Sequence, residues 1–401
     1  MKIKTFEGNV TFPKGFLAAG LNCGLRIKKP DLALIYSVKK CIAVGAFTRN
    51  KFQAAPIIVS KENIKNPIQA IIVNSSNANA GTGEKGIEDA KKMCSITSSF
   101  LNINEKNVLV FSTGVIGKFL DMKKIEKGIK TLIPLLSNRY NQTVSSAILT
   151  TDKMIKECAV EFNIKNKKVR IGSIAKGSGM IEPNMATMLC FITSDVNIKK
   201  SVLKKLFLNA IENSFNLITI DGDMSTNDAV VMLANGMAEN NIIDKTNSKE
   251  AKIFYENLLF VMKRIAYLIV KDGEGVTKVI EIIVKNCSTK EKARIIGKRI
   301  ANSMLVKTAI YGEDANWGRV LAALGSTLQN FDRKKVVIKF GNYIMFKNEK
   351  PVKFDEIALK NYLKNNEIKI TVDLNEGKES ISILTGDLTE EYIRINAKYR
   401  S

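Results

Sequence analysis

Thr187 stands where a glycine-containing loop, KGSGMIEPN (176–184), meets the apolar run MLCFI (188–192), which reads as a buried strand. A threonine hydroxyl placed there can attack the preceding carbonyl, and hydrolysis of the resulting ester leaves threonine with a free α-amine. This amine, with a reference pKa of about 7.7–8, can serve as general base for the adjacent hydroxyl. The small Ala186, the loop before it and the strand after it suit this chemistry. The alternative is an ordinary strand start in which threonine supplies β-propensity.

A second stretch, STGVIG (112–117), could stabilise the anion that such a nucleophile creates. It lies at the exit of the strand-like run NVLVFST (107–113). Thr113 could offer its hydroxyl and Gly114 an unobstructed backbone N–H to a tetrahedral oxyanion. The alternative is a glycine turn that ends a strand.

The chain contains no histidine, which excludes Ser-His-Asp and Cys-His catalysis and histidine-ligated zinc. A carboxylate, a lysine, a tyrosine or an N-terminal amine must act as base if the protein is an enzyme. The six cysteines are far apart and form no C-x-x-C pair, so we expect reduced, mostly buried thiols. The acidic loops DGD (221–223) and DGEG (272–275) are typical of turns, and we expect no metal.

The elements that must position these residues alternate between strand-like and helical patterns. Strands are predicted at 70–76, 107–113 and 277–286, and at 216–228 as a strand entering an acidic loop. Helices are predicted at 123–136, 200–215, 248–270 and 289–305, and the last quarter of the chain is strand-rich. This order predicts a mixed α+β protein with layered sheets, and 401 residues suffice for two or three domains.

The charge and hydropathy pattern limits the partners of the protein. The formal net charge of +23 could attract nucleic acid, and a basic nucleic-acid-binding protein is the alternative from a different functional class. The lysines are nevertheless spread along the chain without an RNA-binding signature, so we expect no nucleic-acid partner. No apolar run reaches the roughly 18 residues of a membrane span, and the N-terminus lacks a signal-peptide pattern. We expect a cytoplasmic protein without membrane contact.

Motifs along essentially the whole chain resemble those of the glutamate N-acetyltransferase family, also called ornithine acetyltransferase. The most specific is KGSGMIEPNMATML. The others follow in the same order: NSSNANAGTG (74–83), STGVIG (112–117), LTTD (149–152), DGDMSTND (221–228), VKDGEG (270–275), GEDANWGR (312–319) and INAKYRS (395–401).

The resemblance implies an enzyme of arginine biosynthesis that moves an acetyl group from N2-acetyl-L-ornithine to L-glutamate, without a cofactor. It implies an α/β/β/α-type sandwich like that of N-terminal-nucleophile enzymes and self-cleavage between Ala186 and Thr187. The products would be an α chain, 1–186, and a β chain, 187–401, associated as α2β2. Residues 187–280 would complete the catalytic core, and 281–401 would form a C-terminal α+β region.

The resemblance also assigns residue roles. Thr187 is the nucleophile, and Thr113 and Gly114 stabilise the oxyanion. The implied substrate contacts are Thr150, Thr151, Lys176, Thr187, Glu274, Asn396 and Ser401. This chain departs from the family pattern at Gly81, where cysteine is usual, and at Lys398 and Ser401, where an acid and a threonine are usual.

Two alternatives share the nucleophile. In a bifunctional form acetyl-CoA is a second acetyl donor, and in an amidohydrolase water resolves the acyl-enzyme.

Overall fold

The computed structural model describes residues 3–182 and 188–398, and the chain divides into two compact units. Unit 1 consists of Met1–Asn216 and Asp223–Ile269, and unit 2 of Leu217–Gly222 and Val270–Ser401. The short segment Leu217–Gly222 thus belongs to unit 2, although the chain on both sides of it belongs to unit 1.

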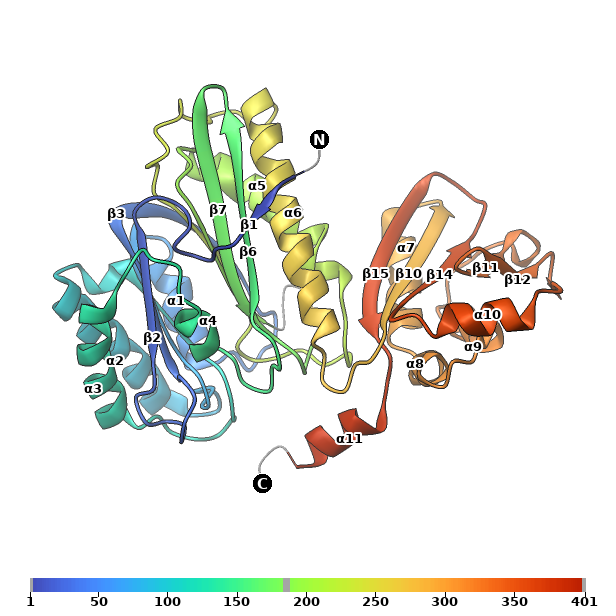
Figure 1. Ribbon diagram of the computed structural model, residues 1–401, viewed down its shortest axis with the longest axis horizontal. Coiled ribbons are helices and arrows are strands. Elements are labelled where there is room, and N and C mark those ends of the chain that lie inside the picture. The colour runs from blue at the N-terminus through green and yellow to red at the C-terminus, as the bar shows by residue number, and fades with distance from the viewer. Residues whose placement is uncertain (1–2, 183–187, 399–401) are drawn as a thin grey trace. The chain divides into compact units, whose positions relative to one another are not determined.

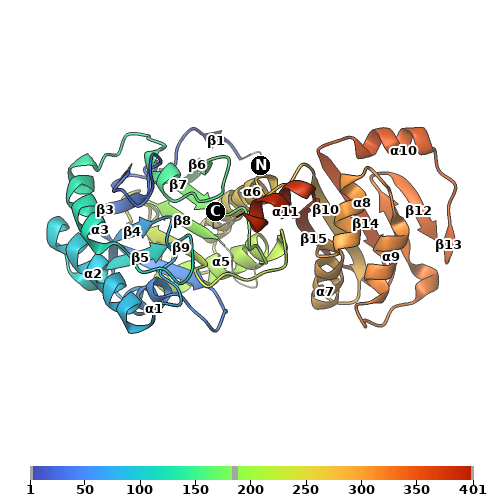
Figure 2. The ribbon, with the colours of Figure 1, turned by 90° about the horizontal axis from the view of Figure 1, so that it is seen from below.

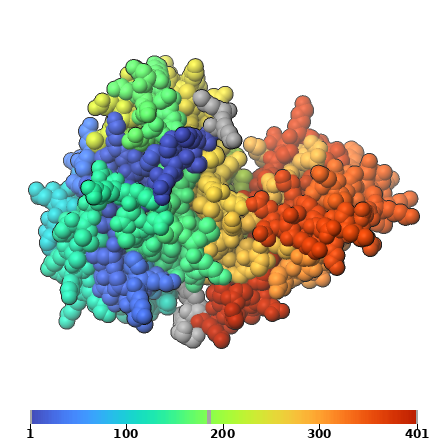
Figure 3. All heavy atoms as spheres, viewed as in Figure 1, coloured from blue at the N-terminus to red at the C-terminus, as the bar shows by residue number. Residues whose placement is uncertain are grey.

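The described strands of unit 1 form a sheet with the order β1-β6-β7-β8-β9-β3-β4-β5, and β2 lies beside β3. Their bounds are β1 Thr5–Phe6, β2 Phe16–Leu21, β3 Leu32–Phe47, β4 Ile68–Asn74, β5 Val108–Ser112, β6 Lys156–Ile164, β7 Lys167–Lys176, β8 Leu189–Ser194 and β9 Ala229–Ala234. The long strand β3 divides this sheet into two groups. Its first part pairs with β2 and β4, and its last part with β9. β1 pairs antiparallel with β6, and in Figure 3 the dark blue N-terminal atoms lie against green ones.

The helices of unit 1 are α1 Ala55–Asn63, α2 Gly83–Leu101, α3 Met122–Leu132, α4 Thr143–Ala147, α5 Lys200–Glu212 and α6 Lys249–Lys271. The central core lies between the two strand groups, where the rings of Phe111 and Phe191 are 5.2 Å apart. Side chains alternate along a strand, so Val110 faces the opposite way and packs with α1, α2 and α3. Helices α5 and α6 cover the other strand group, where Phe162 contacts Phe254 (Figures 1 and 2). The α/β/β/α layering is confirmed.

Unit 2 contains a mixed sheet with the order β13-β12-β11-β14-β10-β15 among the described strands. Their bounds are β10 Val279–Cys287, β11 Val337–Phe340, β12 Tyr343–Lys347, β13 Lys350–Pro351, β14 Glu367–Asp373 and β15 Glu379–Gly386. The helices are α7 Lys290–Ala301, α8 Met304–Tyr311, α9 Trp317–Gly325, α10 Glu356–Leu363 and α11 Glu390–Ala397. Alternate residues of β10, among them Ile280 and Ile282, are fully buried in one core with side chains from α7 to α10. The strand-rich C-terminal region is confirmed.

Short 3-10 helices occupy Glu105–Asn107, Ile133–Leu135, Phe215–Leu217 and Arg333–Lys335. The 3-10 helix Ile133–Leu135 follows α3, which ends at Leu132, so the helix predicted at 123–136 ends early. Pro134 lacks the N–H that a continuing α-helix needs. The helix predicted at 289–305 is interrupted, since Ser303 caps the new helix α8 by accepting from Val306 N.

The strand predicted to begin at 216 was wrong. Only an isolated bridge joins Ile218 to Leu384 there. The carbonyl oxygens that would accept hydrogen bonds from a neighbouring strand accept them from lysine side chains instead. Lys298 Nζ donates to the carbonyl of Ile218 (2.7 Å), and Lys307 Nζ donates to that of Ile220. These side-chain bonds satisfy the backbone without a ladder.

Candidate active site

The STGVIG loop (112–117) leaves β5 and lies directly on the backbone of the NSSNANAG loop (74–81). Thr113 N donates to the carbonyl of Asn74 (3.0 Å), and Val115 N to that of Ser76 (3.2 Å). Gly114 has a φ of +133°, and a Cβ there would lie 2.2 Å from the carbonyl carbon of Ser76. Only glycine fits this close approach. Within the described residues, no hydrogen bond engages the Gly114 amide or the Thr113 hydroxyl, so both remain available as donors.

Buried amide side chains hold the two loops together. The hydroxyl of Ser112 donates to Asn74 Oδ1 (2.6 Å), and Asn74 Nδ2 donates to the carbonyl of Asn77 (2.9 Å). Asn77 Nδ2 donates in turn to the carbonyl of Phe119 (2.8 Å). Asn74 and Ser112 are at most 1% exposed. Bonds to such buried groups fix a loop strongly, since breaking one leaves a desolvated polar atom unpaired.

Asn227, from the DGDMSTND motif, ties both loops to a third segment. Its buried amide nitrogen donates to the carbonyl oxygens of Ala78 (2.6 Å) and Ser112 (2.9 Å). Two residues later, Ala229 N donates to the carbonyl of Met188 (2.8 Å). Because Met188 precedes β8, the start of that strand lies at the same end of unit 1 as the exit of β5.

The predicted cleavage residues, Ala186 and Thr187, lie outside the described residues, as does Ser401. The described part of the chain resumes at Met188. Met188 is linked to the oxyanion candidates through Asn227 and Ala229: Ala229 N donates to the carbonyl of Met188, and Asn227 Nδ2 donates to that of Ser112. The following strand, β8, pairs with β7, whose last residue, Lys176, is opposite Leu189.

Thr150, Thr151 and Lys176, three predicted substrate contacts, are brought together in unit 1. Thr151 Oγ1 lies 2.8 Å from Ser178 Oγ, two residues beyond Lys176. Lys176 is half-buried, and its ammonium has no hydrogen bond or ion pair with any residue that the structure describes. It is therefore available to bind an anion.

Asp152, which was not predicted as a site residue, joins these segments. Its Oδ1 accepts from Lys156 Nζ (2.6 Å) and from Gly177 N (2.7 Å), and its Oδ2 accepts from Thr150 N (3.0 Å). Burial alone would raise the pKa of this carboxyl. The positive charges of Lys176 and Lys156 and the bond from Gly177 outweigh burial and hold the pKa well below its ordinary value.

The other two described substrate contacts, Glu274 and Asn396, meet in unit 2. Glu274 is 6% exposed, and its Oε2 accepts from Asn396 Nδ2 (2.9 Å) of α11. Helix α11 is held to the turn at Gly275, whose carbonyl accepts from Thr389 Oγ1 (2.7 Å). Lys398, one of the departures from the family pattern, follows the end of this helix and is exposed.

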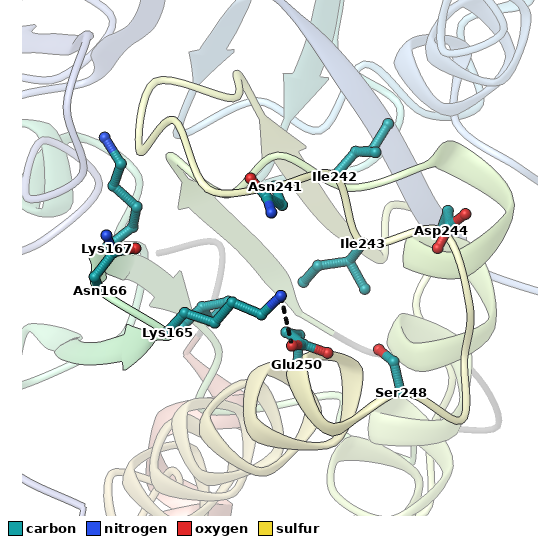
Figure 4. A pocket seen from close by; sticks show the side chains of 10 residues that line it. Lys165, Asn166, Lys167, Asn241, Ile242, Ile243, Asp244, Ser248 and Glu250 are labelled. Carbon is teal, nitrogen blue, oxygen red and sulfur yellow. Dashed lines mark ion pairs between the residues drawn. The ribbon is translucent and has the colours of Figure 1, made fainter.

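A pocket of about 360 Å3 opens elsewhere in unit 1, at the turn between β6 and β7 (Figure 4). Lys165 and Glu250 form a 3.6 Å ion pair in it. The ten residues of β7 separate this turn from Lys176 by about 30 Å, at ~3.3 Å per residue. The pocket is thus not part of the candidate site.

Three further properties concern the described part of the chain. No group of three or more histidine, cysteine or carboxylate side chains there could hold a metal ion. No described helix is both long and apolar enough to cross a bilayer. Five of the six cysteines are buried, and all six are free thiols.

Solved structures that match part of the chain include two proteins with related names. The arginine biosynthesis bifunctional protein ArgJ of Bacillus halodurans is 40% identical and covers 46% of this chain and 98% of its own, with a TM-score of 0.45. The ornithine acetyltransferase of Mycobacterium tuberculosis, solved in complex with ornithine, is 30% identical and covers 46% of this chain and all of its own, with a TM-score of 0.43.

Curated relatives match over full length. The arginine biosynthesis bifunctional protein ArgJ of Caldanaerobacter subterraneus is 46% identical over all of both chains. The protein of the same name from Bacillus subtilis is 44% identical over all of this chain and 98% of its own. The family model of the ArgJ family matches residues 17–401. The chain therefore belongs to the ArgJ family, and it is an enzyme of the acyltransferase class.

Proposed function

We propose that this enzyme transfers an acetyl group from N2-acetyl-L-ornithine to L-glutamate in arginine biosynthesis, through an acetyl ester on Thr187. One observation carries the mechanism: Asn227 Nδ2 donates to the carbonyl of Ser112, where the STGVIG loop begins, and two residues later Ala229 N donates to the carbonyl of Met188, which follows Thr187 in the chain. The substrates are supported by the names of the relatives, which include a protein of arginine biosynthesis and an ornithine acetyltransferase.

The chemistry begins with self-cleavage. Thr187 Oγ attacks the carbonyl carbon of Ala186, the peptide C–N bond breaks, and water hydrolyses the resulting ester. The Ala186 carboxylate and the Thr187 α-amine are then both free. With a reference pKa of about 7.7–8, this amine is substantially neutral near pH 8 and can accept a proton.

Transfer then follows in two half-reactions. Thr187 Oγ attacks the acetyl carbonyl of acetylornithine while its proton moves to the α-amine. The N–H of Gly114 and the hydroxyl of Thr113 donate to the tetrahedral oxyanion. The C–N bond breaks, the proton passes to the departing amine of ornithine, and Thr187 keeps the acetyl group. The neutral amine of glutamate then attacks the ester, and Oγ recovers its proton.

The substrate shared by both half-reactions is an α-amino acid skeleton. Lys176 pairs with its α-carboxylate, since a half-buried ammonium suits a charge-assisted bond to that group. Thr150 and Thr151 add hydroxyl contacts beside Lys176. The family resemblance assigns further substrate contacts to Glu274, a carboxylate that suits an ammonium, and to Asn396, which donates to it. It also assigns one to Ser401, which keeps the hydroxyl that the family pattern expects.

The cleavage is tested by intact-mass measurement of the purified protein. Two chains, 1–186 and 187–401, are expected, and Thr187→Ala should give one uncut chain without activity. Thr193→Ala is a matched control, because Thr193 lies in β8, which follows Thr187 in the chain, and its hydroxyl donates to the carbonyl of Val10. A single uncut chain with full activity would refute the proposal.

The acyl-enzyme is tested by omitting glutamate. Ping-pong transfer predicts release of one equivalent of ornithine per active site, followed by a stop until glutamate is added. Continuous release of ornithine and acetate would instead identify an amidohydrolase. Acetylation of glutamate from acetyl-CoA alone would show the second activity, which the name "bifunctional" of the relatives supports. Neither reaction needs a cofactor.

We also propose an α2β2 assembly in the cytoplasm. The six free thiols are consistent with a reducing compartment. Sedimentation should give about 89 kDa, twice the 44.5 kDa of one chain. A mass of one chain would refute the assembly without affecting the chemistry.

A further inference from the structure

Lys156 and Asp152 form an ion pair whose two side chains are completely buried in unit 1 (0% exposed, Nζ to Oδ1 2.6 Å). A buried pair gains little stability over apolar side chains of similar size, because removing two charges from water offsets their attraction. The pair is therefore better explained by what it does for its neighbours than by stability.

The neighbours of Asp152 are residues of the candidate site. Oδ2 accepts from the amide of Thr150 (3.0 Å), and Oδ1 accepts from the amide of Gly177 (2.7 Å), which directly follows Lys176. One carboxylate thus holds the backbone of both segments that carry predicted substrate contacts. Asp152 also feels the charge of Lys176, although the two side chains form no ion pair within 4.0 Å among the described residues.

Two lysines consequently stand near a single carboxylate, and only one of them bonds to it. Lys156 donates to Asp152 Oδ1, and the backbone amides occupy further acceptor positions of the same group. If Lys156 were absent, Asp152 would be an uncompensated buried anion with Lys176 as the nearby cation. Lys176 would then be drawn toward Asp152 and away from any ligand, since a charge buried at low dielectric attracts its counter-ion strongly.

We propose that Lys156 is a positioning residue: by neutralising Asp152, it leaves the ammonium of Lys176 free to bind the α-carboxylate of the amino-acid substrate. The inference rests on the proposed function, in which Lys176 makes that contact. It assigns to Lys156 a role in selecting substrates that carry a carboxylate.

The test compares kcat/KM for acetylornithine with kcat/KM for its carboxamide, which lacks the negative charge. In Lys156→Met, the preference for the carboxylate should fall about tenfold or more, the range of one lost charge-assisted hydrogen bond, mainly through KM. Lys156→Gln, which keeps a donor toward Asp152 without the charge, should lose the preference as well. In the double variant Asp152→Asn/Lys156→Met no anion competes for Lys176, so the preference should rise severalfold above that of Lys156→Met. Overall kcat/KM should stay below the wild type, because an amide has one acceptor oxygen where the carboxylate has two for the N–H groups of Thr150 and Gly177.

A structural role alone would not produce this rescue. Lys278→Met is the matched control: it removes a buried lysine of unit 2 that pairs with Glu313 (3.2 Å) and should lower stability without changing the preference. The inference would be overturned if folded Lys156→Gln kept the wild-type preference for the carboxylate. It would also be overturned if the double variant showed no stronger preference than Lys156→Met. Lys176→Met tests the assumption beneath it: if that variant keeps the preference, the proposed role of Lys176 fails whatever Lys156 does.

Discussion

Replacing Gly114 by alanine tests the oxyanion assignment most directly. An added Cβ would lie 2.2 Å from the carbonyl carbon of Ser76 and 2.5 Å from the amide nitrogen of Asn77. Both are backbone atoms, so no rotamer change relieves the clash. Ordinary van der Waals contact begins at 3.4 Å. To bring the distance between the added Cβ and the Ser76 carbonyl carbon from 2.2 Å to that value, the two loops must move apart by about 1.2 Å. The Gly114 amide moves with its loop.

The effect on stability has two parts. A non-glycine residue at the positive φ of Gly114 costs about 1–2 kcal/mol, and overpacking typically costs about 1–3 kcal/mol. We therefore expect the free energy of unfolding to fall by about 2–5 kcal/mol. The effect on catalysis is larger in relative terms, because loss of one oxyanion donor lowers kcat by about 10²–10³. KM should change little, since the donor acts on charge that develops in the transition state.

Gly117 supplies the control within the same loop. It also has a positive φ, +79°, but no heavy atom lies within 4 Å of its added Cβ. Gly117→Ala should therefore cost only the strain of about 1–2 kcal/mol and leave kcat nearly unchanged. Acetyl transfer and urea unfolding of both variants provide the measurements. Equal kcat values in the two variants would refute the assignment of Gly114 as an oxyanion donor.

Three further predictions concern buried groups of unit 1. Asn227→Ala leaves the carbonyls of Ala78 and Ser112 without their hydrogen bonds, so the free energy of unfolding should fall by about 1–3 kcal/mol for each lost bond. The change in kcat should be larger than the change in KM. Urea unfolding measures the first effect and steady-state kinetics the second. The folded-state pKa of Asp152 lies below its unfolded value of about 3.9, so the ionised carboxylate stabilises the folded protein fully above about pH 3.9. This contribution is lost as the pH falls from there through the folded-state pKa. The plot of unfolding free energy against pH should therefore be flatter in this acidic range for Asp152→Asn/Lys156→Met. Burial raises the pKa of Cys41 to about 12, so alkylation at about pH 8 should leave this thiol unmodified in the folded protein and modify it after unfolding, as peptide masses would show.

Most of the fold could be predicted from hydrophobic period, because most elements are local. The strand predicted at 277–286 and the helix predicted at 248–270 lie within a residue or two of β10 and α6. The errors arose where a side chain decides a backbone bond. Ser303 starts a new helix by capping, and two lysines replace a strand partner at 218–220. A hydrophobic period carries no information about such bonds.

The sequence likewise indicated some of the site residues and missed others. Motif resemblance indicated the residues that would contact substrate, and the structure brings Thr150, Thr151 and Lys176 together. The resemblance did not indicate a role for Asn227. Its partner Ser112 is 115 residues away, and the bond is to a backbone carbonyl, a group that every residue has, so no residue type marks the contact. The abundance of asparagine in the two loop motifs was the available signal. A recurrent amide side chain in turn-forming segments indicates bonds to backbone, although it does not indicate to which segment.

The absence of histidine makes these supporting groups more important than they would be in a hydrolytic triad. In a triad, a third residue orients the base. In the proposed mechanism, the base is the amine of the nucleophile itself, so its geometry must come from the backbone on either side. Asn227 links the oxyanion candidates to the segment at Met188, and Asp152 holds the two segments that carry the substrate contacts. Both are buried, and a buried polar group has few alternative partners. If this reasoning is correct, Asn227→Ala should slow self-cleavage and acetyl transfer together, whereas Lys156→Gln should impair substrate selection and leave self-cleavage at the wild-type rate.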